Sequence, residues 1–204
     1  NATPDSFSDG GQFDALEVAE RHGKLMQNQG ADLIDVGGES TRPGADYVEI
    51  DEEIARTAPK INKLASVLTV PMSIDTRKAA VARAAIEAGA HIVNDVSGFM
   101  FDADLAPYCA VHNIPVCIMH AQGDPKTMQD NPTYDNIVLD VYDFLEHQIA
   151  RLEQLGLERR QIIADPGIGF GKTLSHNLEL LKHIGVFHSL GVPILLGVSR
   201  KGMI

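Results

Sequence analysis

Short apolar runs alternate with longer segments of helical period along most of this chain. The apolar runs are typical of buried strands, and they lie at 33–36, 70–75, 91–96, 115–119, 162–164 and 193–198. Apolar residues recur at helical spacing in the segments 15–29, 50–68, 78–88 and 136–155. Because strands that alternate with helices form a parallel sheet covered on both faces, the pattern predicts an α/β fold.

Glycine and proline support these boundaries. Gly30, Gly89 and Gly156 follow three of the predicted helices, where a residue in the left-handed conformation often ends a helix. Three of the runs begin with an apolar-Pro-apolar triplet, at 70–72, 114–116 and 192–194. Proline is tolerated at the first residue of a strand, so the triplets fit the strand assignment.

The number of strands favours a closed barrel. The helix at 15–29 should follow a strand that precedes residue 1, and an eighth strand should follow residue 204. We therefore expect one domain over residues 1–204, a (β/α)₈ TIM barrel that lacks its first strand and last strand–helix unit, since such barrels take about 250 residues. An open doubly wound sheet is the alternative, but no G-x-G-x-x-G motif follows the first run.

Composition narrows the class of protein further. The 204 residues are 44% hydrophobic, enough for one sizeable core, and no apolar run reaches the roughly 18 residues of a membrane-spanning helix. A net charge of −11 argues against nucleic acid as a partner but permits a small anionic substrate. Cys109 and Cys117 are the two cysteines, which is typical of a reduced, cytoplasmic protein.

Polar side chains end nearly every predicted strand, where the active site of a barrel lies. They are Asp35 with 39–42, Asp75, Asn94 with Asp95, Met119 with His120, Asp165, and 199–201. Asp75 and Asp165 directly follow apolar runs, so we expect half-buried carboxylates, which need partners. They indicate either a ligand rich in N–H donors, such as an aminopyrimidine ring, or a metal ion.

The glycine-rich segment 165–173 is similar to a P-loop but fails its spacing, which would need glycine where Pro166 stands. This argues against a nucleoside triphosphatase. We expect the glycines to let the backbone approach a flat ligand, with Phe170 as one wall. His120 is a candidate acid or base, although a single histidine of this kind is more often structural.

Three cationic side chains are candidates to bind phosphate in this acidic chain. Arg42, Arg200 and Lys201 lie beside the predicted strand ends, and arginine presents a planar fork suited to phosphate. The sequence shows no Cys/His cluster with zinc spacing and no nucleophile–base pair, which argues against covalent catalysis.

Long motifs in this chain resemble, in order, those of the dihydropteroate synthase family of pterin-binding barrels. The matching segments are 1–11, 35–44, 73–76, 94–95, 119–120 with 123–129, 165–172 and 199–201. The resemblance covers essentially the whole chain. It implies a cytoplasmic, homodimeric transferase of the kind that sulfonamides target. Such an enzyme joins 6-hydroxymethyl-7,8-dihydropterin diphosphate to 4-aminobenzoate and releases pyrophosphate with the help of Mg²⁺.

The resemblance also implies a role for single residues. The expected catalytic residues are Asp75, Asp165 and Lys201. The expected substrate contacts are Thr41, Arg42, Pro43, Asp75, Asn94, Met119, Asp165, Phe170, Ser199 and Lys201, and Asn1 would bind Mg²⁺. Gly202 departs from the family pattern, because many relatives carry a serine there beside the carboxylate of 4-aminobenzoate.

Two other functions fit parts of the pattern. Corrinoid-dependent methyltransferases use a related barrel to bind a methylated folate, but the segment 40–44 and the run 199–201 favour the synthase. A non-catalytic pterin-binding fragment is the second alternative, because a barrel without two of its strands cannot close.

Overall fold

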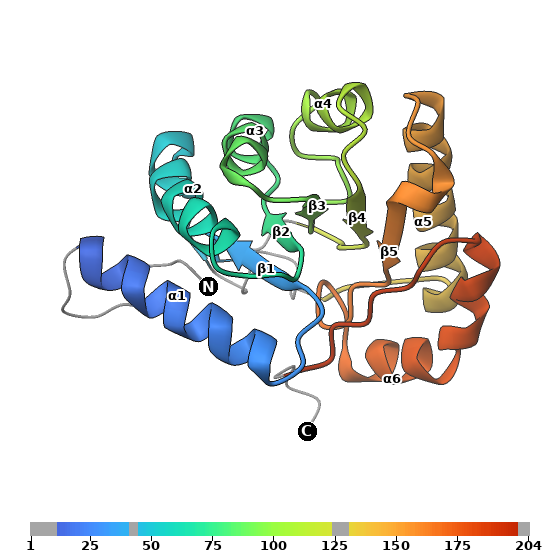
Figure 1. Ribbon diagram of the computed structural model, residues 1–204. Coiled ribbons are helices and arrows are strands. Elements are labelled where there is room, and N and C mark those ends of the chain that lie inside the picture. The colour runs from blue at the N-terminus through green and yellow to red at the C-terminus, as the bar shows by residue number, and fades with distance from the viewer. Residues whose placement is uncertain (1–11, 41–44, 124–130, 200–204) are drawn as a thin grey trace. The chain divides into compact units, whose positions relative to one another are not determined.

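The computed structural model describes residues 12–40, 45–123 and 131–199. In these residues the α-helices are α1 (Gln12–Asn28), α2 (Ile50–Ala65), α3 (Ala79–Ala88), α4 (Leu105–Val111), α5 (Ile137–Gln154) and α6 (Leu174–Lys182). The strands are β1 (Ile34–Gly37), β2 (Met72–Asp75), β3 (Ile92–Asp95), β4 (Val116–Met119) and β5 (Ile162–Asp165) (Figure 1). Short 3₁₀ helices cover Arg159–Gln161 and Ile184–Leu190.

The chain forms two compact units. The first comprises Asn1–Ser40 and Asp46–Asn94, and the second comprises Thr41–Ala45 and Asp95–Ile204. Each unit combines parallel strands with helices, which confirms the predicted α/β class. The single domain expected over residues 1–204 stays a prediction. No helix in the described part of the chain is long and apolar enough to span a membrane.

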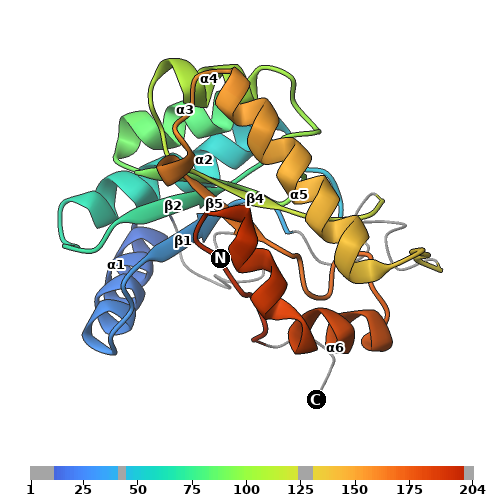
Figure 2. The same ribbon diagram turned by 90° about the vertical axis from the view of Figure 1, so that its right-hand side faces the viewer.

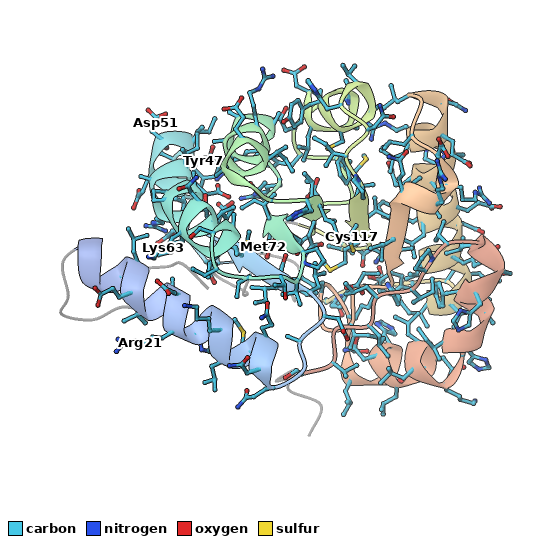
Figure 3. All side chains as sticks on the ribbon, in the orientation of Figure 1. Arg21, Tyr47, Asp51, Lys63, Met72 and Cys117 are labelled. Carbon is cyan, nitrogen blue, oxygen red and sulfur yellow. The ribbon has the colours of Figure 1, made fainter. Side chains whose placement is uncertain are left out.

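In the first unit, β1, β2 and β3 pair in parallel. Their register aligns Gly37 of β1 with Asp75 of β2, and Asp75 with Asn94 of β3. Helix α2 contacts both α1 and α3. Figure 3 shows the side chain of Lys63 on α2, whose ammonium lies 2.8 Å from the Glu20 carboxylate of α1. The carboxyl ends of the three strands are therefore side by side, as parallel pairing requires.

Local signals end and begin the helices where the sequence predicts. Gly89 follows α3 with φ +115°, and its N–H donates to the carbonyls of the last turn. Asn136 precedes α5, and its side chain accepts hydrogen bonds from the N–H groups of Val138 and Leu139. Both features satisfy backbone groups that a helix end leaves without partners.

In the second unit, β4 pairs with β5 in parallel, from Val116 opposite Ile162 to Met119 opposite Asp165. Helix α5 contacts β4, α6 and the 3₁₀ helix at Ile184–Leu190 (Figure 2). Its core face consists of fully buried side chains at helical spacing, namely Val141, Leu145, Ile149 and Leu152. This amphipathic face explains why the segment 136–155 is readable as a helix from sequence.

Two features of the second unit differ from the pattern-based expectation. The run 193–198 forms one parallel bridge, between Ile194 and Ala164, rather than a full strand. Beyond that bridge the described residues form no further pairing with β5, and the side chains of Leu196 and Val198 are exposed. The sequence pattern does not predict helices α4 and α6, because each spans too few turns to show a clear period.

Candidate functional site

The carboxyl ends of β1, β2 and β3 bring predicted site residues together in the first unit. Asp75 is half-buried, and its carboxylate lies beside Gly37, where an added Cβ would stand 3.5 Å from Asp75 Oδ2, an ordinary van der Waals distance. The Asn94 amide donates to Asp35 Oδ2 at 3.3 Å, and Ser73 Oγ donates to Asp35 Oδ1 at 2.5 Å. Asp35 therefore orients the amide of Asn94, which lies next to Asp75 in the register.

Asp95 serves a different purpose. Its carboxylate is fully buried and accepts hydrogen bonds from Ser97 N at 2.7 Å, Ser97 Oγ at 2.9 Å and Phe99 N at 2.9 Å. These bonds fold the turn after β3. The side chain is thus a structural part of that turn, although it ends a predicted strand.

Met119 and Asp165 lie opposite each other at the carboxyl ends of β4 and β5 in the second unit. Both side chains are buried, and Asp165 is 7% exposed. Its Oδ1 accepts a hydrogen bond from Gly167 N at 2.7 Å, and its carbonyl accepts one from His120 N at 3.0 Å. This agrees with the sequence argument that a carboxylate at this position is buried and hydrogen-bonded.

Lys172 is the main residue of this region that sequence reasoning missed. It is 3% exposed, and its Nζ lies 2.9 Å from His120 Nδ1. The ammonium also donates to the carbonyl oxygens of Gly167, Phe170 and His120, at 2.9, 2.9 and 3.1 Å. The sequence signals this lysine only by its place after three glycines, a pattern that fails the spacing of a P-loop.

His120 is buried as the partner of Lys172. Burial, and then the nearby Lys172 charge, lower the pKa of His120 to about 3. The imidazole is therefore neutral at physiological pH, and its Nδ1 accepts from the ammonium. A group with so low a pKa is a poor general base, which supports the structural reading of this histidine.

Two glycines of the segment 165–173 have a role within the protein itself, and their approach to a flat ligand stays a prediction. A Cβ on Gly167, whose φ is +70°, would lie 1.9 Å from the His120 carbonyl oxygen. A Cβ on Gly171, whose φ is +60°, would lie 2.5 Å from the Gln122 carbonyl oxygen. Within this unit the glycines thus let the segment approach the backbone of residues 120–122, and they also provide left-handed conformations.

The remaining predicted residues divide into two groups. Phe170 is half-buried and Ser199 is exposed. Outside the described residues lie Asn1, Thr41, Arg42, Pro43, Arg200, Lys201 and Gly202. Among the residues that the structure describes, no group of three or more His, Cys, Asp or Glu side chains could hold a metal ion.

Comparisons with known proteins place this geometry in a family. A family model described as pterin binding enzyme matches residues 1–204. Dihydropteroate synthase of Escherichia coli (strain K12) is 48% identical over 204 residues, which are all of this chain and 72% of that protein.

Solved structures of dihydropteroate synthases are also similar to this chain. Yersinia pestis dihydropteroate synthase in a sulfonamide drug complex superposes with a TM-score of 0.93 at 45% identity, over 100% of this chain and 74% of that one. The Xanthomonas albilineans enzyme with 4-aminobenzoic acid gives a TM-score of 0.91 at 43% identity, over 100% and 72% of the two chains. This likeness confirms the predicted TIM-barrel class. The chain therefore belongs to the dihydropteroate synthase family of pterin-binding enzymes.

Proposed function

We propose that this chain is a transferase with dihydropteroate synthase activity. It condenses 6-hydroxymethyl-7,8-dihydropterin diphosphate with 4-aminobenzoate and yields 7,8-dihydropteroate and pyrophosphate. The observation that carries the proposal is the identity of 48% with a dihydropteroate synthase over every residue of the chain. The name of the Xanthomonas albilineans complex, which contains 4-aminobenzoic acid, supports the choice of that substrate.

The pterin contacts that we propose have chemistry suited to an aminopyrimidine ring. Such a ring presents several N–H donors along one edge, which carboxylate and amide oxygens can accept. In the first unit these acceptors are Asp75 and Asn94, the latter oriented by Asp35. In the second unit Asp165, held by Gly167 N, would accept from the ring, and the buried Met119 would pack on its face.

The reaction that we propose needs no nucleophilic side chain. The C–O bond to the diphosphate breaks with both electrons leaving on pyrophosphate, so the pterin methylene becomes cationic. The amino nitrogen of 4-aminobenzoate then attacks this carbon and loses a proton. Asp75 and Asp165 stabilise the cation electrostatically, and charge-assisted hydrogen bonds to the ring strengthen as the charge develops.

The contacts to 4-aminobenzoate that we propose are Phe170, Thr41, Arg42, Pro43 and Lys201, and Ser199 is a further proposed substrate contact. Arginine and lysine suit a carboxylate, and an aromatic side chain suits the face of the benzene ring. Lys201 would also reach the pterin. Phe170 and Ser199 lie in the described part of the chain.

We further propose that Mg²⁺ binds the diphosphate, with Asn1 as a ligand. This rests on the resemblance alone, because Asn1 lies outside the described residues and those within them form no metal-binding cluster. Titration of Mg²⁺ into the protein with pyrophosphate, followed by calorimetry, would test it. The cytoplasmic location and the homodimer are proposals as well, testable by cell fractionation and by light scattering.

Incorporation of radiolabelled 4-aminobenzoate into dihydropteroate tests the main proposal. We expect label to be incorporated only when pterin diphosphate is present. Asp165→Asn should weaken pterin binding by roughly 10- to 200-fold, since a charge-assisted hydrogen bond contributes about 1.5–3 kcal/mol. The control Asp104→Asn, at an exposed position before α4, should bind as the wild type does. Absence of incorporation by the wild-type protein would refute the proposed function.

A further inference from the structure

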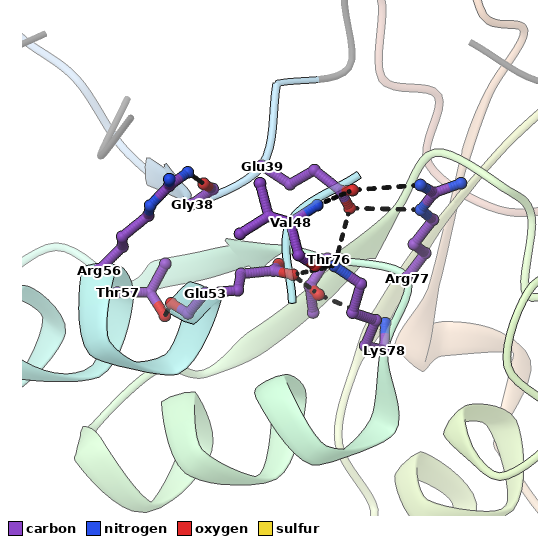
Figure 4. Close-up of polar contacts among 9 residues, drawn as sticks. All are labelled: Gly38, Glu39, Val48, Glu53, Arg56, Thr57, Thr76, Arg77 and Lys78. Carbon is purple, nitrogen blue, oxygen red and sulfur yellow. Dashed lines mark hydrogen bonds and ion pairs between the residues drawn. The ribbon is translucent and has the colours of Figure 1, made fainter. Parts of the chain in front are cut away.

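Four charged side chains meet in the first unit, next to the segment that joins β1 to α2 (Figure 4). They are Glu39, Glu53, Arg77 and Lys78. Glu53 is fully buried and Lys78 is 1% exposed, which is rare for these residue types unless they are paired. The two negative charges of the carboxylates and the two positive charges of Arg77 and Lys78 give the cluster no net charge.

Lys78 is the centre of this cluster. Its Nζ donates to Glu53 Oε2 at 2.6 Å and to the Val48 carbonyl oxygen at 2.6 Å, and it lies 3.1 Å from Glu39 Oε2. The Tyr47 ring centroid lies 4.2 Å from the same nitrogen. An ammonium has three N–H donors, so these three acceptors use all of its hydrogen-bonding capacity.

The cluster holds the backbone of Val48 on both sides. The Val48 N–H donates to Glu39 Oε1 at 3.1 Å, while the carbonyl of the same residue accepts from Lys78. Arg77 holds the Glu39 carboxylate with two further bonds, at 3.1 and 3.3 Å. Although burial raises the pKa of Glu39, the hydrogen bonds from Arg77, Val48 N–H and Lys78 outweigh it and lower that pKa. Glu39 and Val48, nine residues apart, are thus fixed to each other.

Two side chains of helix α2 make further hydrogen bonds at this cluster and at the chain before it. Glu53 in its first turn accepts from Thr76 Oγ1 at 2.7 Å as well as from Lys78. Arg56 donates to the Gly38 carbonyl at 2.9 Å, and a Cβ on Gly38 would lie 2.7 Å from Thr57 Cγ2. The chain before Glu39 is therefore pressed against α2.

A contribution to folding stability does not by itself explain why charged side chains are buried in this cluster. Desolvation offsets much of the attraction in a buried ion pair, and apolar residues of similar volume often stabilise as well. Directed hydrogen bonds, in contrast, fix the position and direction of the backbone atoms that they contact. The observed bonds act on the two ends of one segment, namely Glu39 and Val48.

We propose that Lys78 is a positioning residue, which fixes both ends of the segment 40–47 through Glu39 and Val48 and thereby sets the affinity for 4-aminobenzoate. This inference rests on the proposed function. In that function the segment contributes the 4-aminobenzoate contacts Thr41, Arg42 and Pro43. Lys78 itself touches no substrate in this reading.

The test uses the double variant Lys78→Met/Glu53→Gln, because Lys78→Met alone would leave a buried carboxylate without its cation. Its KM for 4-aminobenzoate should rise at least about tenfold, which corresponds to 1.4 kcal/mol. The dissociation constant for the pterin should change less than about twofold, because its proposed contacts lie outside the segment. The Val48 amide should exchange with solvent at least about tenfold faster, because its fixed acceptor is loosened. Lys63→Met, which removes the ion pair to Glu20, is the matched control and should change none of these.

A second variant covers the case in which the double variant does not fold. Glu39→Gln keeps an acceptor for Val48 N–H but loses the charge that attracts Lys78 and Arg77, so smaller changes in the same direction are expected. If a folded variant shows unchanged Val48 exchange and unchanged KM for 4-aminobenzoate, the positioning role is wrong. If both substrates weaken equally, Lys78 has only a general structural role and the inference fails as well. Should the wild type form no dihydropteroate, the proposed function fails, and Val48 exchange alone then decides whether Lys78 fixes the segment.

Discussion

Lys172→Met is the most informative change in the second unit. The substitution keeps an unbranched side chain of similar length but removes the ammonium that joins His120 to the segment 165–173. In the folded protein that ammonium has four acceptors within 3.1 Å, namely His120 Nδ1 and the carbonyls of His120, Gly167 and Phe170. Its removal leaves buried acceptors without this donor.

The expected loss of stability follows from those acceptors. Water can replace the ammonium at the half-buried Phe170, whereas Gly167 and His120 are buried. Each buried acceptor that loses its partner costs about 1–3 kcal/mol. The variant also avoids the cost of desolvating an ammonium, which offsets part of this loss. We therefore expect the free energy of unfolding to fall by about 2–4 kcal/mol. In a chain of this size that corresponds to a Tm lower by roughly 5–15 °C.

Urea unfolding followed by circular dichroism measures the change. Lys182→Met is the control, since Lys182 is exposed and lies 3.8 Å from Glu179, and it should alter the free energy of unfolding by less than about 0.5 kcal/mol. A Lys172→Met variant as stable as that control would show that these four contacts do not hold the segment. The same variant should also bind the pterin more weakly, because Gly167 N–H orients Asp165.

Three further changes test other parts of the structure. Gly167→Ala should lower the free energy of unfolding by at least about 3 kcal/mol, because the new Cβ would overlap the His120 carbonyl oxygen. Gly30→Ala, at φ +95° with no atom near the new Cβ, should lower it by about 1–2 kcal/mol, and thermal unfolding would measure both. The pKa of His120 lies below its ordinary value of 6.5, at about 3, so the unfolded chain binds a proton there that the folded chain does not. Stability should therefore fall as pH decreases from 6.5 towards 3, by about 2 kcal/mol at pH 5, and His120→Gln should remove that part of the pH dependence in urea titrations. Asn136→Ala should lower stability by about 1 kcal/mol through loss of two hydrogen bonds at the start of α5, and Gln154→Ala, at the exposed other end of the same helix, is the control in thermal unfolding.

The sequence by itself determined the features that depend on near neighbours. The alternation of strands and helices and the left-handed Gly89 after α3 involve residues within about four positions, so the periods and this end signal can be read directly. Burial of Asp165 was predictable for the same reason, because it follows the apolar run of its own strand. The family motifs were likewise contiguous in the chain.

Tertiary structure alone decided which charges are buried and what they hold. A lysine has the same sequence signature whether it is solvated or enclosed, and the partners that enclose Lys172 and Lys78 are distant. His120 is 52 positions from Lys172, and Val48 is 30 positions from Lys78. The need for Gly167 also comes from a distant carbonyl rather than from its neighbours. Desolvation and hydrogen bonding depend on atoms in space, so these roles appear only once the chain has folded.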